Sequence, residues 1–73
     1  MGYETILFDV KDGVATIRLN RPDKLNAFND QMIEETTAAF RQSGRDQAIR
    51  CVVLTGNGRA FSSGQDLSDV TAR

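Results

Sequence analysis

The sequence predicts an α/β fold that is built as a β-β-α-β unit. Three observations support it: an Asp-Gly turn between two short strand-like runs, one apolar stripe at helical spacing, and one solid apolar run. With 73 residues, the chain forms at most one small domain, and 40% of its residues are hydrophobic, as in ordinary globular proteins.

The first element is a β-hairpin. In Thr5–Val10 and again in Val14–Leu19, every second residue is apolar and lies on one face, which is typical of strands. Asp12-Gly13 between them is a strong hairpin signal, because Gly adopts the positive φ that a tight turn needs. Arg21-Pro22 ends the second strand, since Pro has no N–H for a ladder. The expected buried face consists of Ile6, Phe8, Val10, Ala15, Ile17 and Leu19.

The second element is an amphipathic helix. Asn29 or Asp30 is suited to cap its N-terminus, and Ser43-Gly44 is suited to end it. The spacing of 3.6 residues predicts an inward stripe of Met32, Ile33, Thr36, Ala39 and Phe40.

The third element is a strand at Cys51–Thr55. Its unbroken apolar character predicts a parallel strand that is buried on both faces and reached through a crossover, with Cys51 as an inert buried thiol. One helix and one hairpin cannot cover both faces. The chain therefore reads as the opening of a larger domain.

Composition excludes several classes of function. The sequence has no His and one Cys, so it cannot form a Ser–His or Cys–His pair, and neither a metal site nor a disulfide is expected. A net charge of −1 argues against nucleic acid, and no run approaches the ~20 apolar residues that span a membrane. Met1–Thr5 lacks the features of a signal peptide, so a cytoplasmic location is expected.

A small-residue loop, Gly58–Leu67, follows the apolar strand, and Asp66 is placed to open a helix. Strand, Gly turn and helix start together present backbone N–H groups that suit a developing negative charge. A dinucleotide-binding loop is disfavoured, because the third Gly of its fingerprint would fall on Phe61.

Several residues also have plain structural interpretations. Asp66 is better explained as a helix cap than as a general base, and Phe61 as a core residue. Without further information, surface solvation or a turn is the better explanation for Lys24, Arg59, Ser62, Ser63 and Asp69.

Two motifs carry a resemblance to a known family. The run Leu19–Phe28 (LNRPDKLNAF) looks like the N-terminal signature of the crotonase superfamily, the enoyl-CoA hydratases and isomerases. Val53–Gly56 followed by Arg59–Leu67 is similar to its second motif, at the matching distance. The resemblance implies that residues 1–73 are the N-terminal part of a single crotonase-like domain, the first β-β-α turns of a spiral.

The resemblance also implies a function for the complete domain. Its substrates would be acyl-CoA thioesters, with coenzyme A as part of the substrate and no separate cofactor, and it would form homotrimers or hexamers. Two backbone N–H groups would hold the thioester oxygen while an enolate forms. Gln65 matches the first donor. The second donor and the acid/base carboxylates would lie beyond residue 73, so the 73 residues alone are expected to be inactive.

Further positions match the substrate-binding segments of the family. Lys24, Leu25 and Ala27 match the segment that lines the adenosine and pantetheine of CoA. Gln65 with Asp66-Leu67 looks most like the ring-epoxide isomerases of phenylacetate breakdown. The loop around the thioester matches Ser63, Gly64, Gln65, Asp66 and Leu67.

Two functions stay open at this point. The first is an enzyme of the crotonase superfamily, of which the chain is a fragment. The second is a small non-catalytic α/β module with a residual CoA-binding or self-association surface. A stop codon directly after Arg73 in the gene would argue against the enzyme interpretation of this chain.

Overall fold

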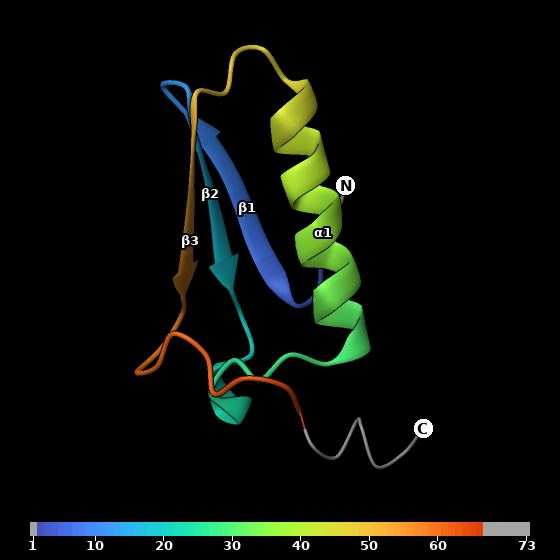
Figure 1. Cartoon of the computed structure of the whole chain (residues 1–73). Coiled ribbons are helices and arrows are strands. Elements are labelled where there is room, and N and C mark those ends of the chain that lie inside the picture. Colours follow the sequence, from blue (N-terminus) through green and yellow to red (C-terminus); the bar gives the residue numbers. More distant parts are fainter. Residues whose placement is uncertain (1, 67–73) are drawn as a thin grey trace.

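The computed structural model describes residues 2–66, which form a three-stranded sheet with one long helix packed beside it (Figure 1). In the sheet order β1-β2-β3, the strands are β1 (Ile6–Lys11), β2 (Val14–Leu19) and β3 (Cys51–Gly56). The helices are a 3-10 turn, η1 (Pro22–Lys24), and α1 (Asp30–Arg45).

The hairpin is confirmed by the structure. β1 and β2 pair antiparallel from Ile6–Leu19 to Lys11–Val14, and both residues of the connecting turn have positive φ, Asp12 at 53° and Gly13 at 79°. Two consecutive positive φ values define the tight turn that matches the twist of the strands. The local sequence therefore sets the register of the hairpin.

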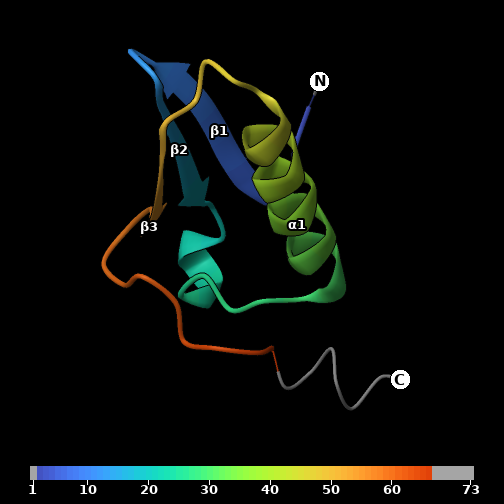
Figure 2. The same ribbon diagram turned by 45° about the horizontal axis from the view of Figure 1, so that its top comes forward.

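The parallel pairing of β3 is also confirmed. β2 pairs with β3 in parallel from Val14–Cys51 to Leu19–Gly56, with α1 as the connection between them. Seen from a second direction, α1 lies over β1 and β2, whereas β3 forms the edge of the sheet away from the helix (Figure 2).

The expected burial of β3 is wrong for the described residues. The exposed fractions are 37% for Val52, 41% for Val53 and 38% for Leu54, and Cys51 is an exposed thiol rather than a buried one. The cause is position: α1 covers β1 and β2, and no described element packs over the edge strand.

The core lies between the hairpin and α1. Its buried cluster consists of Ile6, Ile17, Leu19, Met32 and Ala39. Beside it, the rings of Tyr3 and Phe8 pack edge to face, with their centroids 6.2 Å apart. The helix buries Met32, Thr36, Ala39 and Ser43, so the inward stripe is narrower than predicted. Ile33 and Phe40 are 42% and 43% exposed, and Val10 of the hairpin is 44% exposed, because each lies at the margin of the helix–sheet contact.

The N-terminus of α1 agrees with the prediction from the sequence, whereas its C-terminus lies further along the chain than predicted. Asn29 is the N-cap, with its side chain accepting from the Met32 N–H, as predicted. The helix does not end at Ser43-Gly44 but continues to Arg45, and the Asp46 N–H donates to the Gln42 carbonyl. A Gly inside a helix lowers its stability by about 1 kcal/mol relative to Ala. The packing of the preceding turns against the sheet can offset this loss.

Glu35 fastens the N-terminal segment to α1. Its Oε1 accepts from the N–H groups of Glu4 (2.9 Å) and Thr5 (2.8 Å) and from the Thr5 hydroxyl, while its Oε2 accepts from Gln31. Burial tends to raise the pKa of Glu35, but the hydrogen bonds from Thr5, Glu4 and Gln31 outweigh it and lower the pKa below the ordinary value.

We expect this carboxylate to make stability depend on pH. Because its pKa is lower in the folded state, its stabilising effect is present at neutral pH and is lost as the pH falls through the folded-state pKa. Glu35→Gln should lower the free energy of unfolding at pH 7, and the difference from the native chain should shrink below about pH 4. Urea unfolding across pH measures this, with exposed Glu34→Gln as the control; a constant difference at all pH values would contradict it.

Two glycines should respond oppositely to the same substitution. A Cβ on Gly56 would lie 2.4 Å from the Phe61 carbonyl oxygen, whereas a Cβ on Gly44 meets nothing within 4 Å. Gly56→Ala should therefore lower the free energy of unfolding by about 1–3 kcal/mol. Gly44→Ala should raise it by about 0.5–1 kcal/mol, because Ala favours helix. Denaturant unfolding of the two variants tests the pair, and equal effects would contradict it.

Candidate functional site

The structure brings the two sequence motifs side by side. The Phe28 N–H donates to the Gly64 carbonyl (2.7 Å), and the Asp66 N–H donates to the Phe28 carbonyl (2.8 Å). These bonds form an isolated parallel bridge between Phe28 and Gln65. One step earlier, the Ser63 N–H donates to the Leu25 carbonyl (3.0 Å). Segments almost 40 positions apart in the sequence therefore form one surface.

The bridge determines which way the Gln65 peptide group faces. Phe28 uses both of its backbone groups on the residues that flank Gln65, so the N–H of Gln65 itself points to the other side of its segment. This N–H has no hydrogen-bond partner among residues 2–66, and Gln65 is exposed. Gly64 before it has a φ of 98°, which a residue with a side chain rarely adopts.

An open apolar hollow of about 590 Å³ lies beside this amide. Its wall comes from the bridge, from α1, from β3 and from the loop after β3. The residues that line it include Phe28, Ile33, Leu54, Phe61, Gly64 and Gln65. Phe61 is 53% exposed, so its expected place in the core is wrong: it stands at the rim of the hollow. The arrangement suits an apolar group held next to a backbone donor.

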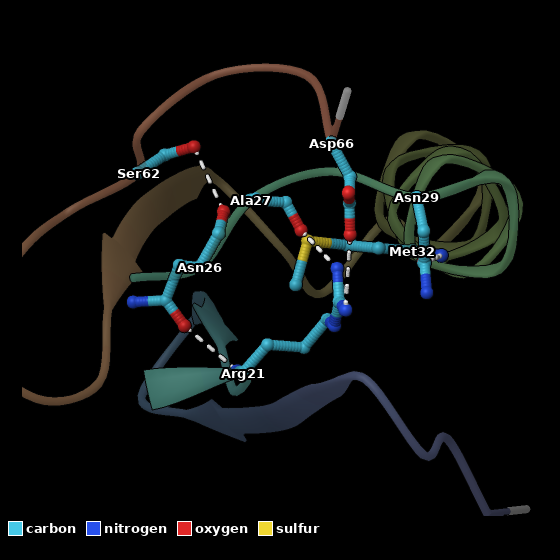
Figure 3. Close-up of polar contacts among 7 residues, drawn as sticks. All are labelled: Arg21, Asn26, Ala27, Asn29, Met32, Ser62 and Asp66. Carbon is cyan, nitrogen blue, oxygen red and sulfur yellow. Dashed lines mark hydrogen bonds and ion pairs between the residues drawn. The ribbon is translucent and has the colours of Figure 1, made fainter. Parts of the chain in front are cut away.

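Asn26 holds the two motifs together and was not singled out from the sequence. It is fully buried, with φ at 55°, and its Nδ2 donates to the carbonyls of Asn57 and Ala60, both at 2.8 Å. Its Oδ1 accepts from the Arg21 N–H at 2.7 Å (Figure 3). The available signal was weak: Asn tolerates left-handed backbone better than most residues.

Ser62 adds a further link, and the turn role predicted for it agrees with the structure. Its hydroxyl donates to the Asn26 carbonyl at 2.8 Å (Figure 3). The same hydroxyl oxygen accepts from the Gly64 N–H at 3.1 Å. These two bonds give the Ser62 hydroxyl a structural role, which does not require a general base beside it. It shapes the turn that leads into Gln65.

Arg21 and Asp66 form an ion pair that the sequence did not indicate. Arg21 Nη2 lies 3.3 Å from Asp66 Oδ2, and the side chains are 17% and 16% exposed. Arg21 Nη1 also donates to the Ala27 carbonyl (Figure 3). Asp66 is thus not simply solvated. The helix that it was expected to cap, like the predicted site residue Leu67 and Asp69, falls outside the described residues.

The residues predicted to line the adenosine and pantetheine of CoA, Lys24, Leu25 and Ala27, lie in the segment that leads from η1 to Phe28. Lys24 ends η1 and is exposed, as is Leu25, which has a left-handed φ of 52°. Ala27 is buried, at 9% exposure. None of the three lines the apolar hollow. They are near it because Leu25 and Ala27 belong to the segment that pairs with residues 63–66.

The described residues show neither a metal-binding cluster nor a membrane-spanning helix. Residues 2–66 contain no group of three His, Cys, Asp or Glu side chains placed to hold a metal ion. Within the same residues, α1 is neither long nor apolar enough to cross a membrane, and no other helix is.

A family model described as enoyl-CoA hydratase/isomerase matches residues 9–73, most of the chain. The chain belongs to the enoyl-CoA hydratase/isomerase family. The resemblance drawn from the two motifs is therefore confirmed, and solved structures of the family support the fold as well. One of them, an enoyl-CoA hydratase/isomerase from Mycobacterium paratuberculosis, has a TM-score of 0.92 at 43% identity, over 94% of this chain and 26% of that one.

Individual enoyl-CoA hydratases and isomerases are similar over nearly the whole chain. The 1,2-epoxyphenylacetyl-CoA isomerase of Escherichia coli K12 is 52% identical over 66 residues, which are 90% of this chain and 25% of that protein. The human enoyl-CoA delta isomerase 2 is 43% identical over 96% of this chain and 18% of its own length. The chain thus spans about a quarter or less of these relatives.

We expect the site of this family member to be sensitive to the buried amide. Asn26→Ala removes the partners of three backbone groups, and each buried group left unsatisfied costs about 1–3 kcal/mol. Asn26→Gly should lose nearly as much stability, although Gly adopts the left-handed φ without strain. The Gly variant therefore separates the loss of the side-chain amide from any strain in the backbone. Urea unfolding is the measurement, with exposed Gln47→Ala as the control. A Gly variant as stable as the native chain would show that the amide matters little.

Proposed function

We propose that this chain supplies the first half of an oxyanion hole in an acyl-CoA hydratase or isomerase. The Gln65 N–H would donate to the thioester oxygen while the substrate passes through an enolate. The observation that carries the proposal is the outward N–H of Gln65, without a partner among residues 2–66, beside the apolar hollow. Family membership supports the choice of a CoA thioester as substrate.

The chemistry explains why a backbone donor suits this position. An enolate places negative charge on the former carbonyl oxygen, and donors that are oriented beforehand stabilise that charge without reorganisation. The direction of the Gln65 N–H is set by the Phe28 bridge and not by a rotamer. The second donor and the acid/base carboxylates belong, in this proposal, to a longer domain of which residues 1–73 are the N-terminal part.

The hollow would receive the acyl group. Its apolar wall includes two aromatic rings, Phe28 and Phe61, which suit a planar or aromatic acyl group. We therefore favour ring-epoxide isomerisation in phenylacetate breakdown over hydration of a simple enoyl chain. The 52% identity to a 1,2-epoxyphenylacetyl-CoA isomerase supports this choice.

The nucleotide end of the substrate would lie along Lys24, Leu25 and Ala27. The exposed ammonium of Lys24 can approach the phosphates, and the loop at Ser63–Asp66 would surround the thioester. Leu67 has the same proposed role on the strength of the motif alone. No cofactor beyond the CoA of the substrate is proposed.

The alternative of a non-catalytic module is not favoured, because the relatives that match are enoyl-CoA hydratases and isomerases. The assembly into trimers or hexamers and the cytoplasmic location stay predictions.

A chimera tests the proposed function directly. The matching segment of the E. coli 1,2-epoxyphenylacetyl-CoA isomerase is replaced by residues of this chain, and turnover of 1,2-epoxyphenylacetyl-CoA is measured. We expect activity, and we expect Gln65→Ala to retain most of it because the N–H remains. Gln65→Pro lacks the N–H and should lose about a hundredfold or more in kcat.

Circular dichroism and CoA binding are the controls for each variant. A folded Gln65→Pro chimera with normal turnover would remove this amide from the site. A Gln65→Ala chimera as inactive as the Pro variant would assign the chemistry to the side chain. A folded chimera that binds CoA but is inactive with Gln65 in place would contradict the proposed function.

A further inference from the structure

Arg21 connects the two sides of the bridge that orients Gln65. Its Nη1 donates to the carbonyl of Ala27, directly before Phe28, and its Nη2 pairs with the carboxylate of Asp66, directly after Gln65. The guanidinium thus spans the pair of segments, one contact on each, in addition to the two backbone bonds of the bridge. Figure 3 shows the side chain extending between the two partners.

The base of this side chain is itself fixed. The Arg21 N–H donates to the buried amide of Asn26 (2.7 Å). Its carbonyl accepts from the N–H groups of Lys24 (2.9 Å) and Asn26 (2.8 Å). A planar guanidinium on an anchored backbone can hold two acceptors at a set separation, which a flexible ammonium cannot do.

The segment that carries Gln65 is held to the first motif by contacts of the residues on either side of Gln65. Gly64 has a φ of 98° and meets nothing within 4 Å of where a Cβ would be, so the chain there is not confined by packing. After Gly64, the Asp66 N–H donates to the Phe28 carbonyl and the Asp66 carboxylate pairs with Arg21, so both bonds join this segment to the first motif. At 17% and 16% exposure, the two charges are shielded enough for the pair to persist.

We propose that Arg21 is a positioning residue, which acts through Asp66 and Ala27 to hold the Gln65 N–H in the direction of the thioester oxygen. The inference rests on the proposed function of that amide. Arg21 does not line the hollow, so it has no contact with the acyl group. Its effect should fall on the transition state, where the oxyanion forms, rather than on substrate binding.

The first measurement uses the 73-residue chain and needs no activity. Backbone ¹⁵N relaxation gives an order parameter for each amide, about 0.85 for a rigid backbone and below about 0.6 for a flexible one. We expect Gln65 to be rigid in the native chain and to become flexible in Asp66→Asn and in Arg21→Met. Amides of α1 should stay rigid, and exposed Asp9→Asn and Arg41→Met are the matched controls.

The second measurement uses the chimera with the E. coli isomerase. Arg21→Met and Asp66→Asn should lower kcat by roughly tenfold to a hundredfold, the scale for a misplaced donor, and change KM less than about threefold. Arg21→Lys should recover part of kcat. The infrared carbonyl stretch of a bound acyl-CoA should shift to higher wavenumber in the Met and Asn variants, because a weaker hydrogen bond polarises the carbonyl less.

Each outcome has one meaning. A rigid Gln65 amide in Asp66→Asn, or an unchanged kcat and carbonyl stretch, overturns the positioning role. A loss confined to KM also overturns it, since that indicates contact with the substrate. If the unmutated chimera is inactive but Gln65 still loosens in the variants of the chain, the proposed function fails while the structural link between Arg21 and Gln65 stands.

Discussion

The site depends on one buried amide, the side chain of Asn26, which bonds three backbone groups from segments more than 30 positions apart. A backbone carbonyl that is shielded from water without a hydrogen-bond partner destabilises the fold. The carbonyls of Asn57 and Ala60, in the loop after β3, find that partner in the Asn26 side chain. The left-handed backbone of Asn26, unfavourable for most residues, is what turns its amide into the space between the two loops. The same two loops meet again at the pairing of Phe28 with Gln65.

The loop after β3 is thereby fixed at both ends. At its start, Gly56 approaches the Phe61 carbonyl so closely that no side chain fits, which lets the chain turn back against the end of the strand. At its far end, the bridge to Phe28 sets the direction of the Gln65 peptide. A backbone N–H held between two such constraints is preorganised, which is the property that stabilisation of a developing oxyanion requires.

Apart from the parallel pairing of β3, which follows from its apolar run and the crossover, the features predicted from the residues alone were local. The Asp12-Gly13 turn and the Asn29 cap depend on conformations of a few neighbouring residues, and both are confirmed. The exposure of β3, the Arg21–Asp66 pair and the role of Asn26 depend on which distant segments meet, which spacing does not encode. The motifs located the candidate site through resemblance, but the geometry that orients it became visible only in the structure.

The uncovered edge strand and the candidate site are linked through alternate residues of β3. Val52 and Leu54 pair in register with Ala15 and Ile17, so they share the face of the sheet on which α1 lies. Leu54 contributes to the wall of the hollow, and part of its exposed surface therefore faces that hollow. Val53, one residue away, faces the opposite side, where no ligand wall is formed by the described residues. Under the proposed function, the two faces of this strand would therefore have different partners: the acyl group of the substrate on the side of the hollow, and further polypeptide on the apolar side of Val53.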